Sequence, residues 1–228
     1  MSSFHHNHYF CLDAFSDLWT SLDVWSALKN IKSFLFSFKG FSIHSSIGEH
    51  VYLENKEQIF IGKNCIIEPG VYIKGPVYIS DNCCIRHGAY IREHTLLAPS
   101  SVVGHASEIK HSILLEEAIA SHFVYVGDSI LGKKVNLGAG VRCANLRLDR
   151  KEVIVRDGDQ KISTGLKKFG AVVGDFTQIG CNTVLNPGTL IQKNVVCYPN
   201  QNISGLIKAE SKICGRDDHP VKKETIVS

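Results

Sequence analysis

A branched apolar residue occupies every sixth position of residues 61–115 without a break. The series comprises Ile61, Ile67, Ile73, Ile79, Ile85, Ile91, Leu97, Val103, Ile109 and Leu115. Neither an α-helix, whose apolar period is 3.6, nor a half-buried strand, whose period is 2, produces this spacing. A small or apolar residue usually follows four places later, as Cys65 and Ala89 do. The pattern is typical of a hexapeptide solenoid and predicts an all-β protein, a parallel β-helix whose coils stack around a shared core.

The repeat is interrupted twice. It slips between Leu115 and Tyr125, where we expect four residues to be gained or lost, and it resumes at Tyr125, Leu131 and Leu137. After a longer interruption it returns over residues 173–191. A break in an otherwise strict repeat marks a place where local chemistry can override stacking.

The longer interruption, residues 146–170, is rich in charged side chains. Within it, Glu152-Val153-Ile154-Val155-Arg156 has the β-branched pattern of a strand between charged residues, and Asp157-Gly158 follows as a turn signal. This combination predicts a β-hairpin that leaves one coil as an extra loop. Insertions in solenoids collect on one face, which is often the binding face.

Apolar residues spaced three or four apart predict one bent helix or two short helices within residues 9–38. They are Phe15, Leu18, Trp19, Leu22, Trp25, Leu28, Ile31 and Leu35. A solenoid ends in an open apolar cross-section, so we expect residues 1–40 to form an N-terminal α-helical cap on the first coils. A docking helix for another protein is the alternative. The solenoid then spans residues 41–204, and the polar residues 205–228 form a loose C-terminal tail.

Composition narrows the class of protein. The 228 residues carry a formal net charge of +3, which is too weak to suggest a nucleic-acid partner. No apolar run is long enough to span a membrane, and residues 1–8 lack the features of a signal peptide, so we expect a cytoplasmic protein without a membrane partner. Of the eight cysteines, Cys65 and Cys83 fall on the small inward position of the repeat, where a reduced thiol acts as a compact apolar group.

Five motifs carry a resemblance to a known family. They are Tyr90-Ile91-Arg92, Gly104-His105-Ala106-Ser107-Glu108-Ile109-Lys110, His122-Phe123-Val124-Tyr125-Val126-Gly127-Asp128, Val135-Asn136-Leu137-Gly138-Ala139-Gly140 and Ala144-Asn145-Leu146-Arg147-Leu148-Asp149. In residues and spacing they resemble the acetyltransferase domain of the bifunctional glucosamine-1-phosphate acetyltransferase/N-acetylglucosamine-1-phosphate uridyltransferase family, and more closely its stand-alone and archaeal-type relatives. The resemblance implies a left-handed parallel β-helix with coils of three hexads, assembled as a homotrimer whose active sites lie between subunits. It also implies transfer of acetyl from acetyl-CoA to the amine of an amino-sugar 1-phosphate, most simply glucosamine 1-phosphate, without a metal.

The same resemblance assigns catalytic roles. His122 is the expected base that takes a proton from the sugar amine, and Glu108, which precedes it by somewhat less than one coil, is expected to support its imidazole. The backbone N–H of Ala139, in a glycine-lined stretch, is expected to stabilise the thioester oxyanion. Asn136 and Asn145 are expected to contact the sugar or its acceptor nitrogen.

A ladder of cations is the candidate phosphate site. With coils of three hexads, as the resemblance implies, Lys74, Arg92 and Lys110 stack on one face at about the 4.8 Å spacing of neighbouring strands. Their mutual repulsion, about 1 kcal/mol per pair in water, would be relieved by a bridging phosphate. A solvated basic face is the plainer interpretation. The resemblance independently assigns Arg92, Lys110 and Tyr125 to the 1-phosphate.

Two further positions follow from the resemblance. Lys151 occupies the place of a substrate-binding lysine in the extra loop of the archaeal-type relatives, and Cys181 stands where a serine contacts coenzyme A. Leu146 replaces an aromatic residue of the bifunctional enzymes. The chain lacks the glycine-rich nucleotide loop of the uridyltransferase domain, so uridylyl transfer would need a separate nucleotidyltransferase.

Two other classes of function stay open. The chain could be a non-catalytic module that regulates such a nucleotidyltransferase. It could instead be a metal-binding solenoid of the carbonic-anhydrase-like kind, because His87 and His105 are also three hexads apart. No third ligand lies at a matching spacing, so the sequence predicts no metal site.

Overall fold

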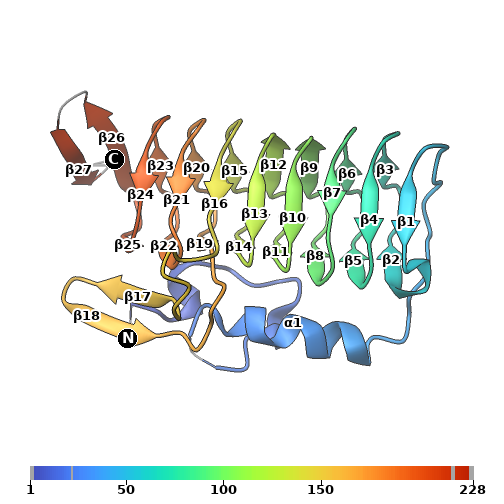
Figure 1. The fold of residues 1–228 in the computed structure, drawn as a ribbon, viewed down its shortest axis with the longest axis horizontal. Helices are drawn as coiled ribbons and strands as arrows, with labels where there is room; N and C mark the ends of the chain where they lie inside the picture. Colours follow the sequence, from blue (N-terminus) through green and yellow to red (C-terminus); the bar gives the residue numbers. More distant parts are fainter. Residues whose placement is uncertain (1–2, 22, 217–218, 226–228) are drawn as a thin grey trace.

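The computed structural model describes residues 3–21, 23–216 and 219–225. Strands succeed one another in three sheets, which are parallel except for the last strand of the third, and each coil contributes one strand to each sheet (Figure 1). The β1 sheet contains β1 (Tyr52–Glu54), β4 (Tyr72–Lys74), β7 (Tyr90–Ile91), β10 (Glu108–Lys110), β13 (Tyr125–Gly127), β16 (Arg142–Cys143), β21 (Val184–Leu185) and β24 (Asn202–Ile203). The β2 sheet contains β2 (Ile59–Ile61), β5 (Val77–Ile79), β8 (Thr95–Leu97), β11 (Ile113–Leu114), β14 (Ile130–Leu131), β19 (Ala171–Val173), β22 (Thr189–Ile191) and β25 (Leu206–Ile207). The β3 sheet contains β3 (Ile66–Ile67), β6 (Cys84–Ile85), β9 (Val102–His105), β12 (Ile119–His122), β15 (Asn136–Leu137), β20 (Gln178–Ile179), β23 (Val196–Cys197), β26 (Ser211–Arg216) and β27 (His219–Thr225).

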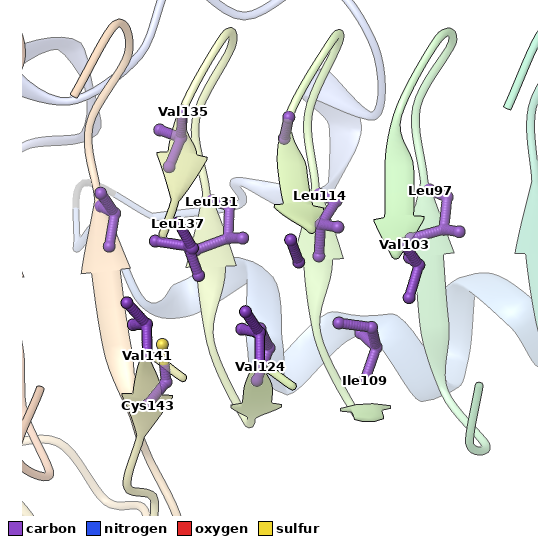
Figure 2. Close-up of a cluster of buried hydrophobic side chains, with 14 of the residues drawn as sticks. Leu97, Val103, Ile109, Leu114, Val124, Leu131, Val135, Leu137, Val141 and Cys143 are labelled. Carbon is purple, nitrogen blue, oxygen red and sulfur yellow. The ribbon is translucent and has the colours of Figure 1, made fainter. Parts of the chain in front are cut away.

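The inward residues of the repeat form the core inside the prism. Figure 2 labels those of several successive coils, which point toward one another: Leu97, Val103, Ile109, Leu114, Val124, Leu131, Val135, Leu137, Val141 and Cys143. Cys65 and Cys83 belong to the same buried cluster, as predicted, and all eight cysteines are free thiols. Each coil therefore covers the apolar corners of its neighbours, which is how a solenoid obtains a core.

The coil length changes partway along the solenoid, and this corrects the predicted register. Ile91 pairs with Ile109 at the full spacing of three hexads, but Ile109 pairs with Val126, which is one position short of that spacing. The inward residue after Ile109 is Leu114, and Leu115 is instead buried on the outside of the β2 sheet. The expected slip of four does not occur. Because Leu114 and Leu115 are both apolar, the sequence could not show which of them faces inward.

Helix α1 (Ser26–Ser37) runs along the outer face of the β2 sheet (Figure 1). Its buried residues Leu28, Ile31 and Leu35 share one apolar cluster with outward residues of that sheet, among them Leu96 and Ile113. Burial of each such side chain contributes about 1.5–3 kcal/mol. The helix is thus present, but it covers a side wall and not the open end that we expected it to cap.

Three short 3-10 helices, η1 (His6–His8), η2 (Ser16–Leu18) and η3 (Lys56–Gln58), complete the irregular segments. Leu22, one of the predicted apolar positions, lies outside the described residues. At the N-terminal end of the prism, the first-coil residues Ile43, Ile47, Val51 and Leu53 are only partly buried. No helix in the described ranges is both long and apolar enough to cross a membrane.

The predicted hairpin is present within residues 146–170. Strands β17 (Ile154–Asp157) and β18 (Gln160–Ser163) pair antiparallel. Val153 and Val155 are buried in the same cluster as Trp25, so the hairpin packs against the N-terminal segment (Figure 1).

The C-terminal stretch departs from the expected loose tail. Strands β25 and β26 lie within residues 205–228, and β26 pairs parallel with β23 as a further rung of the solenoid. Strand β27 then returns antiparallel to β26. The polar composition of this stretch concealed the few inward residues, such as Ile207 and Ile213, that continue the core.

Candidate active site

One corner of the prism gathers three of the predicted site residues. At the turn between the β3 sheet and the β1 sheet, His105, His122, Ala139 and Cys181 occupy the same position in successive coils. Backbone hydrogen bonds join these coils. The carbonyls of His105, His122 and Ala139 accept from backbone amides of the next coil, which belong to Phe123, Gly140 and Asn182, at 3.0, 2.9 and 2.8 Å. We call this set the His122 column. A base, a backbone donor and a thiol are thereby stacked at about the spacing of neighbouring strands.

His122 ends β12, and its side chain is exposed. Its imidazole has no hydrogen-bond partner among the described residues, and its nearest aromatic neighbour is Phe123, with ring centroids 6.5 Å apart. One coil further, the amides of Gly138 and Gly140 donate within the solenoid, whereas that of Ala139 has no acceptor in the described part of the chain. An open imidazole therefore lies beside a free N–H donor, the pair of groups that acyl transfer to an amine requires.

Glu108 does not support this imidazole. It begins β10, opposite Tyr90 and Tyr125 on the wall of the β1 sheet, and its Oε1 accepts a hydrogen bond from Arg92 Nη1 at 2.9 Å. The residue stacked under His122 is His105, and Glu108 follows His105 along the chain, past the corner and onto the next wall. The structure shows no hydrogen bond or ion pair between Glu108 and His122, which corrects the expected pairing.

The predicted cation ladder lies on one wall, because β4, β7 and β10 are adjacent strands. Each cation is already paired with a carboxylate: Lys74 with Glu54 at 3.0 Å, Arg92 with Glu108 at 2.9 Å and Lys110 with Asp128 at 2.9 Å. The Lys74–Glu54 pair is open to solvent and the Arg92–Glu108 pair is half-buried, so water screens the attraction in both. Carboxylates of the chain thus relieve the repulsion that we had assigned to a phosphate, and a phosphate would have to displace them.

Asp128 is a site residue that the sequence analysis did not single out. Its side chain is only 6% exposed and accepts hydrogen bonds from Lys110 Nζ at 2.9 Å, from His111 Nδ1 at 2.8 Å and from the Asn145 amide. Burial alone would raise the pKa of Asp128, but the hydrogen bonds from His111, Asn145 and Lys110 outweigh it and hold the pKa below its usual range. Asp128 closes the motif that begins with His122, which was the available signal.

Tyr125 and Asn145 meet above Gly127. A Cβ at Gly127 would lie 2.6 Å from the Tyr125 hydroxyl and 2.8 Å from the Asn145 amide nitrogen, so only glycine leaves room for both. Burial raises the pKa of Tyr125, with the carboxylates of Glu108 and Asp128 adding to the effect. Arg92, Lys110, Tyr125 and Asn145 therefore stay together on the β1 sheet, beside the His122 column.

Two predicted residues lie apart from this group within one chain. Asn136 begins β15 on the β3 sheet, half-buried and opposite Ile119 and Gln178. Lys151 is exposed in the insertion that leaves after β16 and returns before β19. That insertion starts at the corner between the β1 and β2 sheets, whereas His122 lies at the corner between the β3 and β1 sheets. Lys151 and His122 thus lie at different corners of the prism.

The histidine pair that motivated the metal alternative is held by the backbone. The rings of His87 and His105 are stacked with centroids 5.5 Å apart, and their Nδ1 atoms lie 2.6 and 2.8 Å from the carbonyls of Pro69 and His87. In the described ranges, no three His, Cys, Asp or Glu side chains gather as metal ligands do.

Comparison with known proteins places this geometry in a family. The sequence profile of the GMPPB C-terminal domain matches residues 73–214, more than half of the chain. The chain belongs to the family of the GMPPB C-terminal domain. This match covers every predicted site residue, from Arg92 to Cys181. It therefore includes both the His122 column and the group around Asp128.

Relatives of the family domain include acetyltransferases. The chain is 41% identical over 88 residues to the bifunctional sugar-1-phosphate nucleotidylyltransferase/acetyltransferase of Sulfurisphaera tokodaii, covering 39% of the chain and 22% of that protein. It is 35% identical over 146 residues to the uncharacterized acetyltransferase YaiX of Escherichia coli, covering 64% of each. These matches confirm the family resemblance seen in the sequence. The chain spans only 22–27% of the length of the bifunctional relatives, so their activities are properties of longer proteins.

A solved structure confirms the handedness of the fold. LpxA, a UDP-N-acetylglucosamine acyltransferase from Bacteroides fragilis, superposes with a TM-score of 0.58 over 78% of this chain and 74% of its own. At 16% identity the likeness concerns the fold alone. The predicted left-handed parallel β-helix is thereby confirmed.

Proposed function

We propose that this chain is an acetyl-CoA-dependent N-acetyltransferase that acts on an amino-sugar 1-phosphate, most simply glucosamine 1-phosphate. The observation that carries the proposal is the His122 column: an open imidazole, a free backbone N–H and a thiol in successive coils of one corner. The acetyltransferase relatives support the reaction class.

In the proposed reaction the neutral sugar amine attacks the thioester carbonyl of acetyl-CoA. The new C–N bond forms, and the oxyanion that develops is stabilised by the Ala139 N–H. His122 takes the proton that the amine loses, which contributes about 10²–10⁴-fold to the rate. The C–S bond then breaks, and the coenzyme A thiolate leaves and is protonated. Cys181, exposed in the next coil, is proposed to contact coenzyme A.

The 1-phosphate is proposed to bind on the β1 sheet beside this corner. Arg92, Lys110 and Tyr125 supply two cations and a hydroxyl, and Asn145 supplies an amide toward the sugar. When phosphate binds, it takes the place of carboxylates on these cations. The half-buried Arg92–Glu108 pair opens at little cost, whereas the Lys110–Asp128 pair, whose carboxylate is buried, is harder to open. Asn136 faces outward from the neighbouring wall and is proposed to reach the sugar from that side.

The active unit is proposed to be a cytoplasmic homotrimer in which Lys151 of one chain completes the site of its neighbour. The position of Lys151 and His122 at different corners of one chain supports this arrangement. The product, an N-acetylated sugar 1-phosphate, would then be consumed by a separate nucleotidyltransferase.

Release of free thiol from acetyl-CoA tests the proposal directly. The chain is incubated with acetyl-CoA and either glucosamine 1-phosphate or galactosamine 1-phosphate. We expect stoichiometric thiol release with one epimer at much lower substrate concentration than with the other. Absence of thiol release with both epimers, from a folded oligomer, would contradict the proposed activity.

A second candidate is a non-catalytic β-helix subunit that binds or regulates a sugar-1-phosphate nucleotidyltransferase. One observation favours it: each ladder cation already holds a carboxylate, and Glu108 is engaged by Arg92 instead of His122. A stable complex with a purified nucleotidyltransferase, together with no thiol release from acetyl-CoA, would select this candidate.

A further inference from the structure

A groove runs between helix α1 and the corner at which the β1 sheet turns into the β2 sheet. It has two hollows, which meet at Lys32 and His94 because these residues line both. The smaller hollow, of about 260 Å³, is lined by charged and polar side chains that include Glu93 and Lys168. The larger, of about 610 Å³, has equal numbers of apolar and of polar or charged lining residues, and Lys39 is among the charged ones. No residue of the His122 column lines either hollow, but Lys110, proposed above to bind the sugar phosphate, and its partner Asp128 line the smaller one.

The polar hollow carries unneutralised positive charge. Its buried carboxylate, Asp128, is matched by Lys110 at 2.9 Å, and Glu93 lies 3.9 Å from Arg92. Lys32, from α1, and Lys168, from the stretch after the hairpin, form no ion pair with any residue in the described ranges. Two cations from distant parts of the chain thus converge on one hollow, which favours a bound anion.

The pKa of His94, which lines both hollows, responds to its burial and to this positive charge. Burial, together with the nearby His111 and Lys32, lowers the pKa of His94 to about 4. The His94 imidazole is therefore neutral at pH 7 and offers a hydrogen bond without adding charge. Glu93 contributes one more unused group, since its Oε2 is buried without a partner among the described residues. A ligand hydroxyl could donate to that oxygen.

The larger hollow offers apolar surface next to these cations. Phe36, Phe38 and Phe41 line it together with Leu35. Phe36 is 86% exposed although it is a large apolar side chain on an otherwise well-packed helix. An exposed aromatic at the rim of a hollow is the kind of surface that an apolar ligand group covers.

We propose that this groove binds a phosphate monoester that carries an apolar substituent. The phosphate lies between Lys32 and Lys168, each of which donates a charge-assisted hydrogen bond. The apolar substituent lies along Phe36, Phe38 and Phe41. The site adjoins the proposed sugar-phosphate site, because Lys110 and Asp128 line its polar hollow. Its own binding residues, Lys32, Lys168 and the phenylalanines, have no role in the proposed acetyl transfer, so octyl phosphate binding and thiol release test the two proposals separately.

Calorimetric titration with octyl phosphate, below its critical micelle concentration, tests the proposal. We expect saturable binding that weakens about tenfold or more in the Lys32→Ala/Lys168→Ala double variant. We expect Phe36→Ser to weaken octyl phosphate but to leave binding of inorganic phosphate unchanged. Lys208→Ala, which removes an exposed lysine elsewhere on the solenoid, is the matched control and should bind as the parent chain does. All four positions are exposed, so the variants should keep the fold.

Three results would overturn the proposal. They are no saturable binding of octyl phosphate, equal losses in the double variant and in Lys208→Ala, or equal affinity for octyl phosphate and the uncharged octyl glucoside. Co-sedimentation with phosphatidylcholine vesicles, with and without phosphatidic acid, then separates the two sources of such a ligand. Binding to phosphatidic acid that depends on Lys32 and Lys168 assigns the phosphate to a lipid headgroup, and titration with octyl phosphate alone assigns it to a free ester.

Discussion

Among the individual residues, His122 differs from the other histidines of its corner. Its imidazole is exposed and has no hydrogen-bond partner within the described part of the chain, whereas theirs are hydrogen-bonded to the backbone. The rings of His87 and His105, in the two preceding coils, each have a nitrogen held by a carbonyl. In a solenoid the local backbone is nearly the same in each coil. A difference in side-chain hydrogen bonding therefore separates a candidate catalytic residue from a structural one.

Replacement of His122 tests its role as the base. We expect His122→Ala to lower turnover by about 10²–10⁴-fold with little change in stability, since the side chain is exposed and packs on little. Thiol release from acetyl-CoA measures turnover. His87→Ala is the matched control, because it removes a histidine from the same corner, and it should retain activity. Equal turnover in His122→Ala and the parent chain would remove the assignment.

Asp128 ties three side chains together, and its ionisation is linked to stability. Because its pKa is lower in the folded chain than the ordinary value of 3.8, the carboxylate stabilises the fold above about pH 4, and this contribution is lost as the pH falls through the folded pKa. We expect Asp128→Asn to lower the free energy of unfolding by about 1–3 kcal/mol at pH 7, because Lys110 loses its partner.

Urea unfolding of both chains at pH 7 and pH 3 measures this effect. The difference between parent and variant should shrink at pH 3, where the parent carboxylate is increasingly protonated. A difference that stays constant between the two pH values would show that packing, and not charge, holds Asp128 in place.

At the scale of elements, α1 shows how a helix can be assigned correctly and placed incorrectly. Its apolar spacing was visible in the sequence, and the outward side chains of the β2 sheet that it covers, such as Leu96, Ile113 and Val172, were visible too. Each hexad has one position that always faces the core. In the sequence, these neighbouring apolar residues could therefore not be told apart from further core-facing positions of the repeat. Their outward direction follows from the alternation of side chains along a strand, and that alternation marks the wall that the helix must cover.

Truncation on the inner face of α1 measures how far the fold depends on this wall. We expect Ile31→Ala to lower the free energy of unfolding by about 2–5 kcal/mol, because Ile31 is fully buried between helix and sheet. Lys29→Ala on the exposed face of the same helix should change it by less than about 0.5 kcal/mol. Equal stability of both variants in urea unfolding would mean that the helix is dispensable for the fold and is available to dock a partner.

At the scale of the whole molecule, the candidate site is split between corners. His122 and Lys151 lie at different corners, because the extra loop leaves the prism at a different corner from the His122 column. A closed ring of three chains, in which each loop reaches the next corner, would bring them together.

Mixed assemblies test this arrangement. We expect His122→Ala and Lys151→Ala chains to be nearly inactive alone and to regain measurable thiol release when they are refolded together. Mixed trimers then contain sites that combine an intact His122 from one chain with an intact Lys151 from another. If the mixture stays as inactive as its components, the loop does not act across subunits. Sedimentation velocity checks that each preparation has the mass of three chains of 25.2 kDa.

The period-six pattern was sufficient to establish the β-helix, its core and the shared wall of Arg92 and Lys110, because a residue that repeats along the chain must repeat in space when each coil has the same length. Contacts between coils depend on the coil length itself, and the shortening of the coil after Ile109 was hidden by the adjacent Leu114 and Leu115. That small change decides that His122 stacks on His105, whereas Glu108 meets Arg92 across a coil of full length. Only the tertiary structure could decide these pairings, since hydrogen bonds across coils select one register among several that bury the same apolar side chains equally well.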